Sequence, residues 1–459
     1  MKTSRLTGKI FPESLRAGWI LVLTAFFLAW AFLRLTWRPE DPPKGADATS
    51  WFAPALNLAH GDFLENPENF FRGPLLPAFG VAAFKMFGQE TPYAVILLQI
   101  GVFLGTLLAT VAIARALEAP MPWLAGWLLL LNPNSFSTVF LNQSETVFAA
   151  ITAAVALLLL KQLKSPAWGT ALLLGFVLGL SCLGRPNYVL FLLGYPWLLF
   201  LLSVGSGSRA ILLIRNLTGS LVGLALCGLW MSGSYLLGQG FHLTPRSAFA
   251  VYINDMAYLA ESLEKKSSLS ANPEGHRSAV WKKLEEQIGD DWHDLTEKEK
   301  NDAKVQLGWA RLGQVSPRTL AVAQAKAFAQ FWFNAGSGNF YELLRWDRVN
   351  LTRWWIQYDR RSLQPVLDLL CSLPREYFAV MAACFFYVFL GRMLMVWGFL
   401  RLIRAGQIRE LVLLGCLLLY LSNIQFLSGS SRRRVPVEPV VAALMALPLG
   451  RRKCRPTRP

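Results

Sequence analysis

The sequence predicts an all-α polytopic membrane protein with about ten transmembrane helices, and three observations support this fold class. Of its 459 residues, 54% are hydrophobic and only 16% are charged, whereas a soluble protein of this size has roughly 25% charged residues. The apolar residues gather in runs of about 17 to 25, the length at which a helix crosses ~30 Å of hydrocarbon. Basic residues gather in the connections between alternate runs, as in the cytoplasmic loops of membrane proteins.

The apolar runs predict the spans in order along the chain. The first run follows a basic N-terminal segment and is too long for the apolar core of a signal peptide, so we expect it to be retained as a span. The segment 74–87 is apolar but too short to cross, which indicates an interfacial or re-entrant helix. We predict spans at residues 17–36, 92–117, 120–132, 145–163, 167–184, 187–204, 210–237, 376–400, 410–428 and 435–450.

An even number of spans places both termini in the cytoplasm. The connections that hold Arg115, Lys161 and Arg209 and the basic tail then all face the cytoplasm, which satisfies the positive-inside rule. The same rule accounts for the net charge of +16, so we expect no nucleic-acid partner. Short loops and a compact basic tail favour a bacterial inner (plasma) membrane.

This predicted topology divides the chain into three parts. Residues 1–237 form an N-terminal transmembrane module with a first outer loop at 37–91. Residues 238–375 form an extracytoplasmic helical loop, and 376–459 form the C-terminal transmembrane helices and the basic cytoplasmic tail. Within the loop, 255–311 mixes acids and bases and predicts solvated helices. The stretch 317–333 is amphipathic and predicts a helix that lies at the membrane surface.

Several arginines lie at the outer ends of predicted spans, where the positive-inside rule disfavours them. Guanidinium groups bind phosphate oxygens through two parallel hydrogen bonds and stay charged near a low-dielectric boundary. This indicates a site for an anionic lipid phosphate. The alternative is that the side chains only reach the headgroups of surrounding lipids. The candidate phosphate-binding residues are Arg72, Arg185, Arg432 and Arg434.

Two acids share this outer side and are candidate catalytic residues. Asp47 lies in the first outer loop, where a carboxylate can act as general base toward an acceptor hydroxyl. The alternative is that Asp47 caps the helix expected to begin near Ala48. Glu145 opens the fourth predicted span, where the helix dipole stabilises an acid, or it is a second acid of the site.

Other chemistries find little support in the sequence. It contains no HExxH, GxxxxGK[ST], GxSxG or CxxC motif. The six cysteines fall mostly inside apolar runs without paired spacing, which is typical of core residues rather than of disulfides or metal ligands. We therefore expect no cofactor and no metal site.

Taken in order, these segments resemble the membrane glycosyltransferases of the GT-C superfamily, in particular the group of protein O-mannosyltransferases and lipid A aminoarabinose transferases. The resemblance covers most of residues 45–205 and a patch near 430–443. It is carried by ALNLAHGDF, FRGPLLPAFGVAAFKMFG, LLQIGVFLGTLLATVAIARAL, LLLLNPNSFSTVFLNQSETVF, LGLSCLGRPN and RRRVPVEPVV.

The resemblance implies an inverting transfer of a sugar from a polyprenyl-phosphate donor to a lipid, glycan or protein acceptor at the outer membrane face. It implies Asp47 as the catalytic base and Glu145 as the acid that opens a span. The same four arginines would stabilise the leaving lipid phosphate. The loop 238–375 matches only loosely, so the acceptor stays open. No aspartate pairs closely with Asp47, so no metal site is implied.

Two other functions remain open from the sequence. A flippase or exporter of lipid-linked sugars would need a continuous polar path across the bilayer. A non-catalytic assembly subunit of an envelope complex would need no site at all. Transporters favour broken helices or charges at mid-membrane, whereas the strong polar positions here are predicted at the outer boundary.

Overall fold

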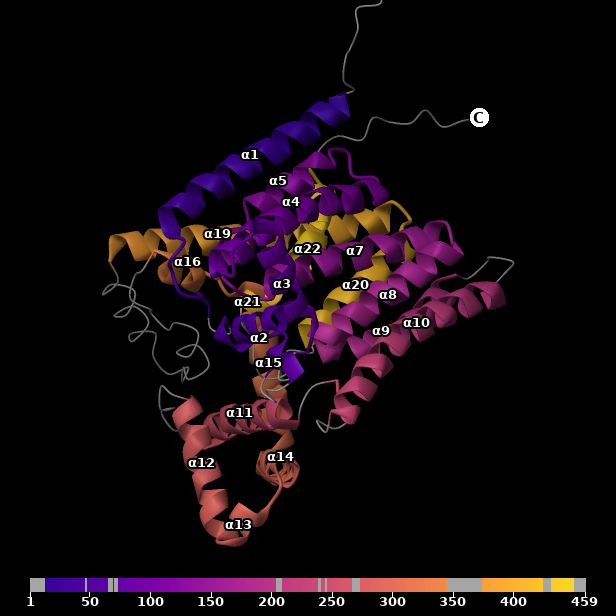
Figure 1. Cartoon of the computed structure of the whole chain (residues 1–459). Helices are drawn as coiled ribbons and strands as arrows, with labels where there is room; N and C mark the ends of the chain where they lie inside the picture. Colours follow the sequence, from indigo (N-terminus) through magenta and orange to yellow (C-terminus); the bar gives the residue numbers. More distant parts are fainter. Residues whose placement is uncertain are drawn as a thin grey trace, which may run out of the picture.

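The computed structural model describes residues 13–45, 48–64, 69, 73–203, 209–237, 241–243, 246–265, 273–344, 374–423 and 431–449. Within these ranges the chain forms helices joined by short connections, and no strand is present (Figure 1). The predicted all-α fold class is confirmed.

Within the described residues, five helices are long and apolar enough to cross a membrane, and each matches a predicted span. They are α1 (Glu13–Thr36), α4 (Pro92–Ala116), α7 (Glu145–Lys164), α10 (Arg209–Leu236) and α19 (Arg375–Arg404). The other predicted spans match shorter helices. These are α5 (Trp123–Leu130), α8 (Trp168–Gly184), η3 with α9 (Pro186–Tyr188 and Val189–Leu202), α20 (Ile408–Asn423), and η4 with α22 (Val435–Val437 and Glu438–Ala446).

Helix α22 lies at the centre of the bundle (Figure 1). It packs against α4, α5, α7 and α19, and all of its residues are buried. A helix that is buried on every side needs apolar or small side chains all round, and EPVVAALMA supplies them with one exception. The exception is Glu438, which is 2% exposed and therefore needs partners inside the protein.

Glycines bring α8 and α10 into close contact. A Cβ on Gly175 would overlap the backbone of Gly219, and a Cβ on Gly179 would lie 2.7 Å from the Cα of Gly223. Small residues spaced in this way allow helix backbones to approach each other in membranes. This close packing against α10 fixes the position of α8, the helix that Arg185 directly follows.

The segment predicted as the first outer loop folds onto the bundle as short helices. These are α2 (Thr49–His60), η1 (Asp62–Leu64) and α3 (Leu75–Phe87), and the nearby α6 (Pro133–Thr138) precedes α7. α3 coincides with the predicted short apolar helix and packs against α2, α4 and α8.

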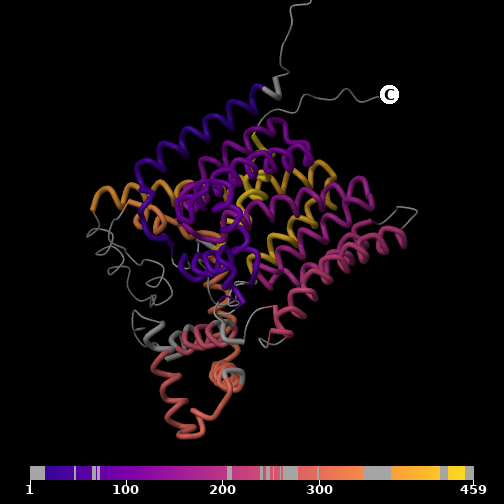
Figure 2. Tube along the Cα trace, viewed as in Figure 1, coloured from indigo at the N-terminus to yellow at the C-terminus, as the bar shows by residue number. Residues whose placement is uncertain are grey.

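A second group of helices lies at one end of the molecule, apart from the bundle (Figures 1 and 2). It consists of α11 (Arg246–Lys265), α12 (Pro273–Ile288), α13 (Asp291–Asp294) and α14 (Glu297–Gln314). This agrees with the solvated helices predicted for 255–311.

Helix α15 (Pro317–Phe333) joins this group to the bundle and is followed by α16 (Gly338–Leu343). It packs against α11 at one end, and against α19 and α21 (Ser431–Arg434) at the other. Phe331 and Trp332 in its last turn are buried. The prediction that 317–333 lies along the membrane surface is therefore wrong for this end, because its apolar side chains pack inside the protein.

Candidate functional site

Glu145 and Arg185 form an ion pair at one end of the bundle. Glu145 is the first residue of α7, and Arg185 directly follows α8. The Arg185 Nη2 atom donates to Glu145 Oε1 at 3.0 Å and to Ser144 Oγ at 2.9 Å. The guanidinium also lies over the Phe148 ring, 4.4 Å from its centroid. Two candidate residues predicted from the sequence are therefore in direct contact.

The two members of this pair differ in burial. The Glu145 side chain is 3% exposed, whereas the Arg185 side chain is 21% exposed. A buried carboxylate needs a cation to offset its desolvation, and the N-terminus of α7 adds the partial positive charge of the helix dipole. The pair thus combines a buried acid with a cation that reaches the protein surface.

The backbone that carries Arg185 is fixed by its two neighbours. A Cβ on Gly184 would lie 2.7 Å from the Phe148 ring and 2.9 Å from Leu75 Cδ2, so a larger residue here would have to displace these two side chains. Pro186 has no N–H group with which to continue α8, and it begins η3. Helix α8 therefore ends at a defined residue, and Arg185 has an extended backbone there (φ −140°, ψ 98°).

The first outer loop lies against the segment that leads into α7. The Asn142 N–H donates to Lys44 O at 2.7 Å, and the Lys44 N–H donates to Asn142 Oδ1 at 3.1 Å. Gly45 has a φ of +120°, and a Cβ there would lie 2.7 Å from the Gln143 side chain. Trp51 Nε1 donates to Asn142 O at 2.9 Å. The loop is therefore attached just ahead of the ion pair.

The segment that leads into α3 lies against the end of α8. Gly73 has a φ of +67°, and a Cβ there would overlap the Leu183 carbonyl oxygen, so only glycine fits. Leu183 is two residues before Arg185. Two parts of the first outer loop, residues 44, 45 and 51 and residue 73, therefore lie against the segments that lead to Glu145 and Arg185.

Three predicted site residues are not placed by these contacts. Asp47 and Arg72 lie outside the described residues, and the side chain of Arg432 does too. The N-cap of α2 is Ala48. The alternative role of Asp47 as the N-cap of this helix stays a prediction, because Asp47 lies outside the described residues.

Arg434 is fully buried and belongs to a second charged cluster. Its Nε donates to Glu438 Oε1 at 2.6 Å. Its Nη1 donates to the carbonyl oxygens of Phe331, Trp332 and Asn334 at 2.9, 3.2 and 2.9 Å. Among the described residues, Nη2 has no hydrogen-bond partner. Burial lowers the pKa of Arg434 to about 10 and the Glu438 carboxylate opposes this shift, so the guanidinium stays charged at neutral pH.

Arg392 completes the second cluster, and the sequence reasoning missed it. Its Nη2 donates to Glu438 Oε1 at 2.6 Å, and its Nε donates to Trp332 O at 3.1 Å. Since Arg392 lies within α19, the prediction that strong polar positions are limited to the outer boundary is wrong. The available signal was a lone arginine inside the predicted span 376–400, because an ionisable residue within a span is costly unless it has a partner or a function.

The two clusters lie on neighbouring elements. η4 and α22, which follow Arg434, pack on α7, which begins at Glu145. Helix α6 packs against α7, η4 and α21. The described side chains of the two clusters contain three arginines and two glutamates, which leaves an excess of one positive charge.

Neither a metal site nor a disulfide is found within the described ranges. No three His, Cys, Asp or Glu side chains gather there closely enough to hold a metal ion. The described cysteines are free, and they are Cys182, Cys227, Cys384 and Cys416.

No protein-family model matches the chain, and no curated protein sequence matches it either. Among solved structures, the chain is similar to ArnT from Cupriavidus metallidurans bound to undecaprenyl phosphate, with 12% sequence identity and a TM-score of 0.41 over 94% of this chain and 77% of that one. It is also similar to ArnT from the same organism in the apo state, with 13% identity and a TM-score of 0.37 over 94% of this chain and 78% of that one.

Proposed function

We propose that this chain is a glycosyltransferase that takes its sugar from a polyprenyl-phosphate donor. The observation that supports the proposal is the Glu145–Arg185 ion pair, and two parts of the first outer loop lie against the segments that lead to it. Arg185 is the exposed member of the pair, so it can face a ligand while Glu145 holds it in place. The motifs that resemble the GT-C group occur in the same order around this pair.

In the proposed reaction, Asp47 takes the proton from the acceptor nucleophile as it attacks the anomeric carbon of the sugar. The bond between that carbon and the phosphate oxygen breaks on the opposite face, so the configuration inverts in one step. Negative charge grows on the departing lipid phosphate, and preorganised cations stabilise it most in the transition state. We assign Arg185 to this phosphate, with Arg72 and Arg432 as further donors. Arg434, which the sequence predicted as a fourth donor, is not assigned to it, because its side chain is fully buried against Glu438 and backbone carbonyls.

We assign Glu145 a positioning role at this site. Both Glu145 and Ser144 contact the same nitrogen of Arg185, Nη2. A bidentate contact to phosphate needs two N–H groups in a fixed plane. Anchoring one edge of the guanidinium while Phe148 supports its face would set this plane before the donor arrives.

We further propose that the site faces the exterior or periplasm of a bacterial inner membrane, with both termini in the cytoplasm. The module 1–237 would carry the donor chemistry, and 376–459 would complete the bundle. The loop 238–375 would select the acceptor, which can be a lipid, a glycan or a protein.

The direct test of this function is Arg185→Ala. We expect a folded protein with about 100-fold lower transfer activity, since loss of one preorganised charge donor typically costs ~3 kcal/mol of transition-state stabilisation. The assay follows transfer from a labelled polyprenyl-phosphate sugar in membranes that contain the wild type or the variant at equal abundance.

Arg215→Ala is the matched control. Like Arg185, Arg215 lies near an aromatic ring, 5.7 Å from the Trp168 ring centroid, but its Nη1 donates to a backbone carbonyl, Pro166 O at 3.2 Å. It lies near the start of α10, at the predicted cytoplasmic side, and should leave transfer unchanged. Wild-type transfer by Arg185→Ala would refute the phosphate role, and equal losses in both variants would show that the effect is not specific to this site.

A further inference from the structure

A cavity of about 350 Å³ lies in the group of helices apart from the bundle. None of the residues that line it belongs to the candidate site described above. Its volume lies within the range of ~300–1,000 Å³ that is typical of small-ligand sites. The lining residues used below come from α12, α13 and α14, and they are Trp281, Lys282, Glu285, Trp292, Lys300 and Lys304.

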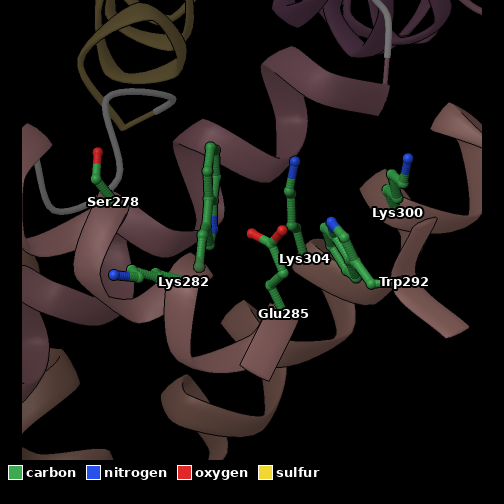
Figure 3. Close-up of a pocket in the computed structure, with 7 residues that line it drawn as sticks. Ser278, Lys282, Glu285, Trp292, Lys300 and Lys304 are labelled. Carbon is green, nitrogen blue, oxygen red and sulfur yellow. The ribbon is translucent and has the colours of Figure 1, made fainter. Parts of the chain in front are cut away.

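Two tryptophans give this cavity large, flat apolar surfaces. Trp292 is only 7% exposed, so packing fixes its ring. The Lys304 ammonium lies 4.7 Å from the Trp281 ring centroid and 5.6 Å from that of Trp292. A cation this close to two indole rings is stabilised by their π-electrons. Figure 3 shows the Glu285, Lys304 and Trp292 side chains close together in the cavity.

The charges that line the cavity are mostly positive. Lys282, Lys300 and Lys304 outnumber the single acid, Glu285. In Figure 3, Lys282 and Lys300 lie on opposite sides of Lys304. If cation–π packing were the only role of this arrangement, Lys304 alone would fulfil it. Two further lysines from different helices raise the local positive potential, which attracts anions.

We propose that this cavity binds an anionic saccharide, that is, a sugar that carries a phosphate or a carboxylate. The lysines supply the charge for the anionic group, and the parts of the two indole rings that Lys304 does not cover supply apolar contact for the C–H groups of a sugar ring. A lipid surface is disfavoured as the occupant, because α12 and α13 lie at the end of the molecule farthest from the apolar bundle (Figure 1). This site does not depend on the transfer chemistry proposed for Arg185.

The test is titration calorimetry on the purified full-length protein in detergent, with glucose 6-phosphate, galacturonic acid and neutral glucose as probes. We expect both anionic sugars to bind and glucose to bind at least about tenfold more weakly. Lys304→Met removes the charge between the rings while keeping a similar length, and should weaken the anionic probes by about tenfold.

Lys283→Met is the matched control, since Lys283 neighbours Lys282 on α12 and is exposed but does not line the cavity. It should leave binding unchanged. The proposal is overturned if neither anionic sugar binds, or if Lys283→Met weakens binding as much as Lys304→Met. It is also overturned if inorganic phosphate or adenosine monophosphate binds as tightly as the sugars, because the cavity would then be a general anion or nucleotide site.

Discussion

The two charged clusters of the bundle contain the same residue types but differ in burial. In the first, 21% of the Arg185 side chain is exposed beside Glu145. In the second, Arg392, Arg434 and Glu438 are 6%, 0% and 2% exposed. A guanidinium that is buried against backbone carbonyls joins elements of the fold, whereas one that reaches the surface can also bind a ligand. An arginine at a predicted outer boundary is therefore not enough to indicate a phosphate site, because its burial decides what it can contact.

The buried cluster is expected to show its role in stability. Glu438→Gln removes the only carboxylate that the described structure places between Arg392 and Arg434. Breaking a buried ion pair by removing one partner typically costs ~3–5 kcal/mol, because the remaining charge is left uncompensated. We therefore expect a large drop in the thermal unfolding midpoint of the detergent-solubilised protein.

Glu410→Gln is the control for Glu438→Gln. Glu410 pairs with Lys164 at 3.5 Å, and the Lys164 side chain is 35% exposed. Pairs of this kind contribute about 0–1 kcal/mol. Similar midpoints for the two variants would show that the buried cluster does not hold α15 and α19 together, and the contrast between the clusters would fail.

Two glycine substitutions, one near each charged cluster, test the same difference between the clusters, and we expect them to change stability less than Glu438→Gln does. A Cβ on Gly398 would overlap the Leu444 carbonyl oxygen where α19 crosses α22, and backbone cannot easily give way. Gly398→Ala should therefore cost ~1–3 kcal/mol of stability through overpacking. A Cβ on Gly184 meets only the Phe148 and Leu75 side chains, which can move. Gly184→Ala should instead displace Arg185 and lower transfer about 10- to 100-fold.

Unfolding midpoints and transfer rates are measured together for both glycine variants. Gly194→Ala on α9 is the control, because nothing lies within 4 Å of a Cβ there, and it should change neither quantity. A Gly184→Ala variant with wild-type transfer would mean that the position of Arg185 does not matter to the reaction.

The spans could be predicted from the sequence because their signal is local. A run of apolar residues must form a helix in lipid to satisfy its own backbone, and the predicted runs coincide with the observed helices to within a few residues for α4, α7 and α8. The run 120–132 is less regular, since its helix α5 covers only Trp123–Leu130. Pro122 and Pro133 limit it, because proline cannot continue a helix from within.

The site was predictable only in part. The predicted topology placed Glu145 and Arg185 on the same side of the membrane, and the structure brings them into contact. The partners of Glu438 could not be predicted, because Arg392 is 46 residues away and the contact depends on how α19 crosses α22. The buried end of α15 was missed for the same reason, since an amphipathic pattern does not specify whether lipid or protein covers its apolar face.

The most direct test of the central claim is binding of a polyprenyl monophosphate to the purified protein, followed as the rise in its thermal unfolding midpoint. A ligand that binds only the folded state stabilises it by about 2.7 kcal/mol at 100 times its Kd. We predict such a rise for the wild type and for Arg215→Ala, and a much smaller one for Arg185→Ala. An equal rise in all three proteins would contradict the account, because the lipid phosphate would then bind without the cation at the outer end of α8.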